Sequence, residues 1–264
     1  MATDTGTGTR TRPRRGVRLW ILQSLTAGVG ICSILWAFSA LPAYRAEAAF
    51  EGVAHDILSG KSFDAVRLGE LKTKLDSMPA DQLRSVAVDA AVIRLRLLDV
   101  KLAEGALAVG SPYVTDAGAA LAAALSQDPS NSFLWFADYS LNRLRGGALD
   151  RGSKLLRMSY ETGPNEAWIA QRRSAVALTN WISLPGDLLD QALSEFVRLV
   201  QSGLYEEAGN IVAGPGWPIH QQLLGRLAPL SEADRHAMAR ELARRDLDGV
   251  SVPGIPDKRP SRPF

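Results

Sequence analysis

The 264-residue sequence contains one cysteine, Cys32, and only three histidines. A single cysteine excludes an intrachain disulfide, so an exported domain of this chain must be stabilised by packing alone. The histidines, His55, His220 and His236, lie far apart, and none has a second histidine or cysteine three or four residues away. Because a zinc site needs three or four converging ligands, we expect no metal site, and no pattern indicates an organic cofactor.

The motifs that identify common catalytic sites are also missing. The sequence has no Gly-x-Ser-x-Gly elbow and no glycine-rich phosphate loop. Basic residues are concentrated at the two ends: residues 1–18 carry a net charge of +4 and residues 249–264 carry +2, so the residues between them carry −4. This distribution predicts no surface for nucleic acid, and together these absences favour a protein that is not an enzyme.

Charge is absent from one long stretch. The 26 residues of Leu19–Tyr44 contain no charged side chain, and five arginines precede them. About 20 apolar residues at a rise of about 1.5 Å each cross a hydrocarbon core of about 30 Å, so this stretch predicts a transmembrane helix. The arginines should remain in the cytoplasm, which places the bulk of the chain on the other side. The lack of disulfides and the Ala-, Arg- and Gly-rich composition favour a bacterial inner membrane and periplasm.

A cleaved signal peptide is the alternative interpretation of this N-terminus. Ala46-Glu47-Ala48 matches an A-x-A-like cleavage site, with cleavage before Ala49. The apolar run is much longer than the stretch of about 7–15 residues that such peptides use, which favours an uncleaved anchor over residues 19–44.

No run of alternating apolar and polar residues predicts a strand. Between residues 46 and 248, apolar residues recur at spacings of three or four and are interrupted by short glycine and proline turns. This pattern predicts an all-α domain of antiparallel helix hairpins, with its longest helix over Ala80–Ala108 and an alanine-rich helix, Thr115–Gln127, buried between two neighbours. Residues 1–18, a basic cytoplasmic segment, and the proline-rich residues 249–264 are expected to be disordered tails.

Turn residues and tryptophans recur at a similar period within this domain. Pro129 and Pro164 end helices 35 residues apart, and Trp135 and Trp168 lie 33 residues apart. The segment between them resembles a tetratricopeptide repeat, whose period is about 34 residues. The next unit, from Asn165, falls out of frame.

The resemblance extends to small residues at expected helix crossings. Gly152 and Ser159 match the small positions of the second helix of a repeat, whereas Arg143 stands at the family's usual tyrosine position. The resemblance implies a stack of helix hairpins that binds peptides or partner proteins in a concave groove.

A second resemblance concerns a shorter run. Residues 156–169, together with Glu195-Phe196, look like small anchored proteins of bacterial exopolysaccharide biosynthesis clusters. This resemblance implies a role in polysaccharide synthesis or export by association, since no residue in the run requires a polysaccharide ligand.

Aromatic residues and arginines share one predicted helix face. Trp135, Tyr139 and Arg143 are spaced by four residues, and Trp168 and Arg172 repeat the arrangement one unit later. Such a surface can stack on sugars or hold acidic polymer and peptide chains. The alternative is that the rings belong to the core and the arginines lie at its edge.

These observations favour a membrane-anchored scaffold of a cell-envelope assembly, with an inner-membrane protein complex as its partner and exopolysaccharide synthesis or export as a candidate process. A periplasmic chaperone or translocon accessory is the first alternative, because it would share the fold and topology. A polysaccharide-modifying enzyme is the second, and it would require acid and base groups such as Glu161, Glu166 and His220 to converge.

Overall fold

The computed structural model describes residues 15–105, 110–247 and 250–256; within the first helix the side chains of residues 15–19, 21, 22, 24 and 38–46 are not described. The described chain is all-α and contains no strand. Its α-helices are α1 (Arg15–Leu58), α2 (Ala65–Asp76), α3 (Ala80–Ser85), α4 (Ala87–Ala103), α5 (Pro112–Gln127), α6 (Ser132–Leu144), α7 (Leu149–Thr162), α8 (Ala167–Thr179), α9 (Gly186–Gln201), α10 (Tyr205–Ala213), α11 (His220–Gly225) and α12 (Glu232–Arg244), with 3-10 turns η1 (Trp181–Ser183) and η2 (Trp217–Ile219).

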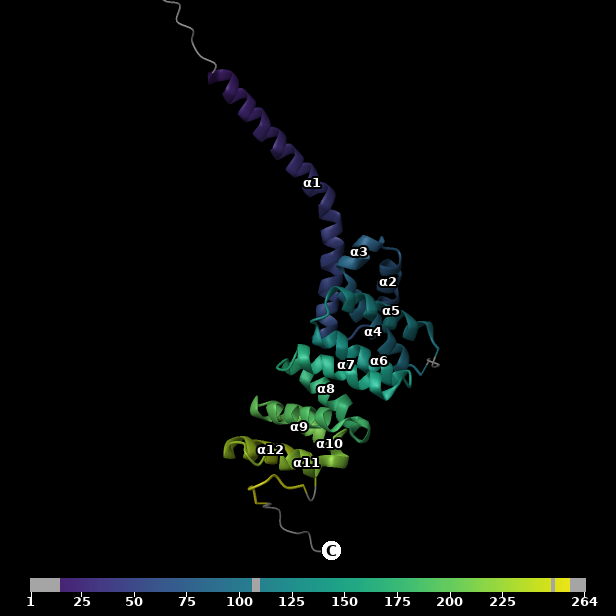
Figure 1. The fold of residues 1–264 in the computed structure, drawn as a ribbon, viewed down its shortest axis with the longest axis vertical. Coiled ribbons are helices and arrows are strands. Elements are labelled where there is room, and N and C mark those ends of the chain that lie inside the picture. Colours follow the sequence, from purple (N-terminus) through teal and green to yellow (C-terminus); the bar gives the residue numbers. More distant parts are fainter. Residues whose placement is uncertain (1–14, 106–109, 248–249, 257–264) are drawn as a thin grey trace, which may run out of the picture.

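Helices adjacent in sequence pack against each other in pairs. α4 packs with α5, α6 with α7, and α8 with α9, and α10 packs mainly with α12 (Figure 1). Successive pairs then contact one another, since α5 and α8 both pack on α6, and α7 packs on α9. The predicted all-α class and the packing of neighbouring helices are confirmed, and the arrangement is compatible with a helical repeat.

α1 is one continuous helix across the predicted boundary between anchor and domain. Its second half packs on α4, whereas its first half extends away from the other helices (Figure 1). Every side chain of residues 25–37 is exposed. Within the described residues, no helix combines the length and apolar character needed to cross a bilayer. Since Leu19–Tyr44 includes side chains outside that set, its transmembrane role stays a prediction.

The core runs along the stack in three clusters. The first joins the end of α1 with α2 and α4 through Phe50, Leu75 and Ile93. The second joins α4, α5 and α6, and there the alanines of α5 let its neighbours approach: Ala117 and Ala124 are fully buried. The third cluster spans α6 to α12. The predicted burial of the alanine-rich helix between two others is therefore confirmed.

One sequence expectation about helix boundaries is wrong. The predicted helix over Ala80–Ala108 is divided into α3 and α4 at Val86, whose backbone leaves the helical region (φ −104°, ψ 21°) and whose side chain is buried. No glycine or proline lies at this break, so no local sequence signal marks it. Residues 106–109 lie outside the described residues.

The two terminal segments also differ from the expected disordered tails. Residues 15–18 already belong to α1. In the C-terminal segment, Val252 is buried in the third core cluster, and Arg235 Nη1 donates a hydrogen bond to the Pro253 carbonyl at 2.8 Å. Residues 250–256 therefore pack back onto α12. Residues 1–14 and 257–264 lie outside the described part of the chain.

The small residues expected at the α6–α7 crossing lie there. A Cβ atom on Gly152 would lie 3.1 Å from Asn142 Nδ2 and 3.6 Å from the Tyr139 ring. Further along α7, Ser159 Oγ donates a hydrogen bond to the Ser132 carbonyl of α6 at 2.9 Å. Larger side chains at either position would force the two helices apart.

A buried polar cluster joins α7, α8 and α9. Arg173 and Glu195 form an ion pair from which solvent is fully excluded. Arg173 Nη1 also donates to the Ser159 carbonyl at 2.6 Å, and Ser174 Oγ donates to Glu195 Oε2 at 2.9 Å. The Arg173 guanidinium lies 4.1 Å from the centroid of the Tyr160 ring. This cluster fixes the position of α8 relative to the two helices on either side of it.

Candidate functional site: a groove between α4, α6 and α8

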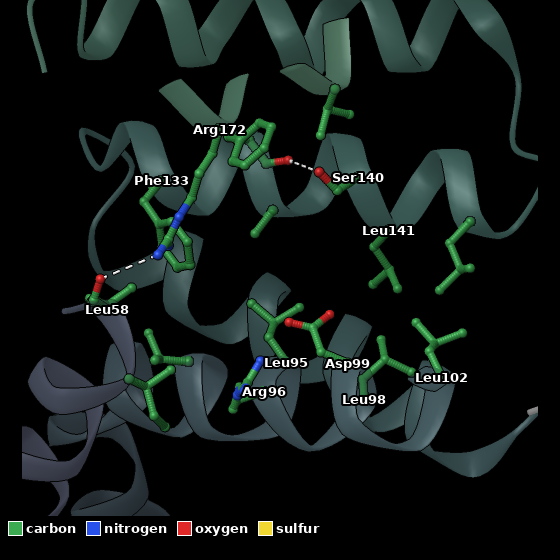
Figure 2. Close-up of a pocket in the computed structure, with 16 residues that line it drawn as sticks. Leu58, Leu95, Arg96, Leu98, Asp99, Leu102, Phe133, Ser140, Leu141 and Arg172 are labelled. Carbon is green, nitrogen blue, oxygen red and sulfur yellow. Dashed lines mark hydrogen bonds between the residues drawn. The ribbon is translucent and has the colours of Figure 1, made fainter. Parts of the chain in front are cut away.

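A groove opens between α4, α6 and α8, and Leu58 at the end of α1 lies at one end of it (Figure 2). Its volume is about 560 Å³. α4 and α6 face each other across it although α5 separates them in sequence. We call this space the groove, and we distinguish its Leu58 end from its opposite end.

Helical periodicity on α4 and α6 produces the groove. On α4, Leu95, Leu98 and Leu102 recur every three or four residues and therefore share a face. On α6, the short side chains of Ala137 and Ser140 line the opposite wall and leave the space open. The Ser140 hydroxyl donates to a carbonyl of its own helix at 3.0 Å, so it retains only the capacity to accept a hydrogen bond from a ligand.

Two guanidinium groups lie toward the Leu58 end, Arg96 from α4 and Arg172 from α8 (Figure 2). Arg172 Nη2 donates to the Leu58 carbonyl at 3.3 Å, and its guanidinium lies 6.0 Å from the centroid of the Trp168 ring. Arg96 Nε is enclosed and has no hydrogen-bond partner among the described residues. Neither arginine forms an ion pair within 4 Å with a described residue, so both guanidinium groups retain donors for a ligand.

One carboxyl group, Asp99, points into the groove from α4 between the Leu58 end and the leucines of the opposite end (Figure 2). Partial enclosure by the groove walls raises the pKa of Asp99 above its ordinary value, while the charges of Arg96 and Arg172 act in the opposite direction. Enclosure prevails because water is displaced from a carboxyl group that accepts no hydrogen bond from the described residues.

The opposite end of the groove is apolar. Leu98 and Leu102 of α4 and Leu141 of α6 lie there (Figure 2), and Leu144, three residues after Leu141 on α6, also lines the groove. Leu102 and Leu144 are 38% and 40% exposed, which is unusual for leucines that flank a core. The groove therefore offers guanidinium donors at one end, a carboxyl acceptor in the middle and apolar contact area at the other end.

Of the predicted aromatic and arginine surface, only part reaches this groove. Arg172 lines it, and Trp168 lies beside it, 43% exposed and with its ring 5.6 Å from that of Phe133, a groove residue. Sequence reasoning paired Trp168 with Arg172, and the structure brings these two side chains together.

The other three predicted residues are turned away from the groove. Tyr139 is buried in the core, and burial raises the pKa of its hydroxyl. Trp135 is half-buried and donates from Nε1 to the Pro129 carbonyl at 2.8 Å. Arg143 Nη2 donates to Asn180 Oδ1 at 2.7 Å. For these residues the structure matches the alternative in which rings belong to the core and the arginine lies at its edge.

The groups named for an enzymatic alternative do not line the groove. Glu166 Oε2 accepts a hydrogen bond from Ser132 Oγ at 2.9 Å, and Glu161 is exposed near the end of α7. His220 begins α11, where its ring stacks on Trp217 at 4.5 Å and its Nδ1 lies 2.7 Å from the Trp217 carbonyl. Across the described residues, no three His, Cys, Asp or Glu side chains are grouped so that they could hold a metal ion.

Sequence reasoning did not single out Arg96, Asp99 or Phe133 as site residues. A signal for the first two is present: they are charged residues three positions apart, flanked by the leucines of one α4 face. Charged residues that interrupt an apolar face are candidates for a partly enclosed site. Phe133 carries no comparable signal, because its spacing is that of an ordinary core residue.

No protein-family model matches this chain, and no curated protein and no solved structure matches it. Its function must therefore be inferred from the groove and from the chain's own chemistry.

Proposed function

We propose that the protein is a membrane-attached interaction scaffold that holds a segment of a partner protein in the groove between α4, α6 and α8. The groove is the observation that supports this proposal. It is open to solvent, lined mainly by apolar side chains, and built from three helices of successive pairs. Such a site can bind a chain without any bond-making step.

The first half of α1 supports attachment to a bilayer of the cell envelope. Its described apolar side chains are exposed, with Leu25, Leu35 and Trp36 each more than 60% accessible. Exposed apolar patches of this extent mark surfaces that a membrane or a partner covers. Together with the arginines that precede it, the segment favours an N-terminus in the cytoplasm and helix pairs in the periplasm.

Within that role, we favour an assembly that produces or exports exopolysaccharide. The support is the resemblance of residues 156–169 to anchored proteins of such clusters, and the partner would be a membrane-embedded subunit of the same machinery. A chaperone or translocon accessory would use the same groove, and partner identity distinguishes the two roles.

Site-specific photocrosslinking of the full-length protein in native membranes tests the groove. A photoreactive phenylalanine analogue at Leu102 or Leu144, both of which line the groove, should yield the same crosslinked product. The analogue at Leu149, 53% exposed on α7 outside the groove, is the matched control and should not yield it.

Filling the groove provides the second half of the test. Ser140→Trp should remove the crosslinks from Leu102 and Leu144, because an indole would occupy the space between α4 and α6. Crosslinks of equal yield from Leu149, or crosslinks that persist in the Ser140→Trp variant, would overturn the proposal. Identification of the crosslinked protein by mass spectrometry separates a polysaccharide assembly from a translocon.

A further inference from the structure

The groove is chemically uneven along its length, and this unevenness indicates what it binds. We propose that its occupant is an apolar segment of a partner protein that carries an acidic residue at one end, with the acidic side chain against Arg96 and Arg172. This inference rests on the proposed function and specifies the partner's chemistry.

Charge complementarity determines the acidic end. Arg172 donates to a backbone carbonyl and lies against the Trp168 ring, and Arg96 Nε is enclosed without a hydrogen-bond partner among the described residues. An enclosed guanidinium donor without an acceptor is unfavourable, and a carboxylate satisfies several such donors at once. Asp99 is the one carboxyl group among the described groove residues, against two guanidinium groups, so the groove lining carries more positive than negative groups.

The apolar part of the occupant follows from the opposite end. Leu102 and Leu144 expose more than a third of their surfaces there, beside Leu98 and Leu141. Along α4 the groove extends from Val92 to Leu102, which at a rise of about 1.5 Å per residue corresponds to roughly 15 Å. An extended segment of about four or five residues has this length.

The polar groups in the middle favour a polypeptide over a fatty-acid chain. Asp99 accepts no hydrogen bond from the described residues, and the Ser140 hydroxyl already donates within α6, so both can accept hydrogen bonds from a ligand. Backbone N–H groups of a peptide supply donors at regular intervals. A hydrocarbon chain with a terminal carboxylate supplies none.

Binding of synthetic peptides to the full-length protein in lipid nanodiscs tests the inference. The probes are pentapeptides with blocked termini that contain four Leu or Phe residues and one Glu, placed at the first or at the last position, and matched peptides in which Gln or Lys replaces the Glu. We expect Glu peptides to bind about tenfold more tightly than Gln peptides, and Lys peptides more weakly than both. This preference should decrease at high salt.

Variants of the protein test whether the preference for Glu peptides arises in the groove. Arg96→Gln and Arg172→Gln should each reduce binding of Glu peptides about tenfold and leave Gln peptides unchanged. Arg151→Gln is the matched control, since Arg151 is 65% exposed on α7 outside the groove and should have no effect. Leu102→Asp places a negative charge in the apolar end and should prevent binding of every peptide. Thermal melting by circular dichroism establishes that each variant is folded.

The possible failures are distinguishable. If Glu and Gln peptides bind equally well and Leu102→Asp prevents both, the acidic preference is wrong and the groove remains a binding site. If no peptide binds, or if binding is insensitive to Leu102→Asp, this inference and the proposed function both fail. If dodecanoate binds through Arg172 and the peptides do not, the occupant is a lipid chain and the assignment to a protein segment is overturned.

Discussion

Arg173 of α8 and Glu195 of α9 form an ion pair with no exposed surface on either side chain. Their remaining donors and acceptors are used by the Ser159 carbonyl of α7, the carbonyl of Gly163 directly after α7, and the Ser174 hydroxyl of α8. Charges leave water at high cost, and the surrounding hydrogen bonds offset part of it. The pair therefore orders three consecutive helices of the stack, whatever its net contribution to stability.

Removing one member of this pair should be strongly destabilising. We expect Glu195→Ala to lower the free energy of unfolding by about 3–5 kcal/mol, because the Arg173 charge would remain buried without a partner. The double variant Arg173→Met with Glu195→Leu should lose less than Glu195→Ala alone, since it buries no charge. Urea denaturation of the three proteins measures the difference, and equal losses in both variants would contradict this account.

Asp89 should make the docking of α1 on α4 depend on pH. Enclosure between these helices, and then the charge of Glu51, raise the pKa of Asp89 to about 6. The unfolded chain loses this proton near its ordinary pKa, which is lower, so the native state binds the proton more tightly. Stability should therefore fall as pH rises through the interval between about 4 and 6 and remain low above it.

Asp89→Asn should remove this penalty. Near pH 7 we expect a gain on the order of 1 kcal/mol, after allowance for solvent screening, and no change well below pH 4. Thermal melting across the pH range measures the effect. Glu51→Gln removes the second cause of the raised Asp89 pKa, so the pH transition should shift downward and still be present. A gain for Asp89→Asn that is the same at all pH values would indicate a cause other than titration.

The spacing of apolar residues and the positions of turn residues predicted the helices well where both indicated the same helix boundaries. The stretch between Pro129 and Gly163-Pro164 was expected to be a helix pair with small residues at its crossing, and α6 and α7 meet through Gly152 and Ser159 as expected. The break at Val86 was not predictable in this way. No glycine or proline lies at the break, and Val86 is buried by neighbours that the local sequence does not identify.

The site was predictable only in part for a related reason. A four-residue spacing shows that Trp135, Tyr139 and Arg143 share a face, but it does not show which neighbouring helix covers that face. In the structure that face is turned away from the groove. The groove lies between α4 and α6, which α5 separates in sequence. Arg172 was identified through its four-residue spacing from Trp168, and Arg96 was missed because the opposite wall of the groove is distant in sequence.

Gly152 should not tolerate a large side chain. We expect Gly152→Leu to lower the free energy of unfolding by about 1–3 kcal/mol, because even its Cβ would approach Asn142 and the Tyr139 ring. Gly69→Ala is the matched control, since nothing lies within 4 Å of a Cβ at this helical position. That change should stabilise the protein by up to about 1 kcal/mol through helix propensity. Urea denaturation distinguishes the two signs, and a neutral Gly152→Leu would contradict the close crossing of α6 and α7.

The C-terminal segment should contribute to stability although its prolines suggested a disordered tail. Val252 is 3% exposed and joins the core cluster that spans α6 to α12, and Arg235 holds the adjacent Pro253 carbonyl. We expect Val252→Ala to lower the free energy of unfolding by about 1 kcal/mol, because two buried methyl groups are lost. Ser251→Ala, at the exposed neighbouring position, is the control and should be close to neutral. Hydrogen exchange adds a local readout, since Val252→Ala should speed exchange in α12 and leave α4 unchanged. Equal stability of the two variants would show that residues 250–256 rest on the surface of α12 without anchoring to the core.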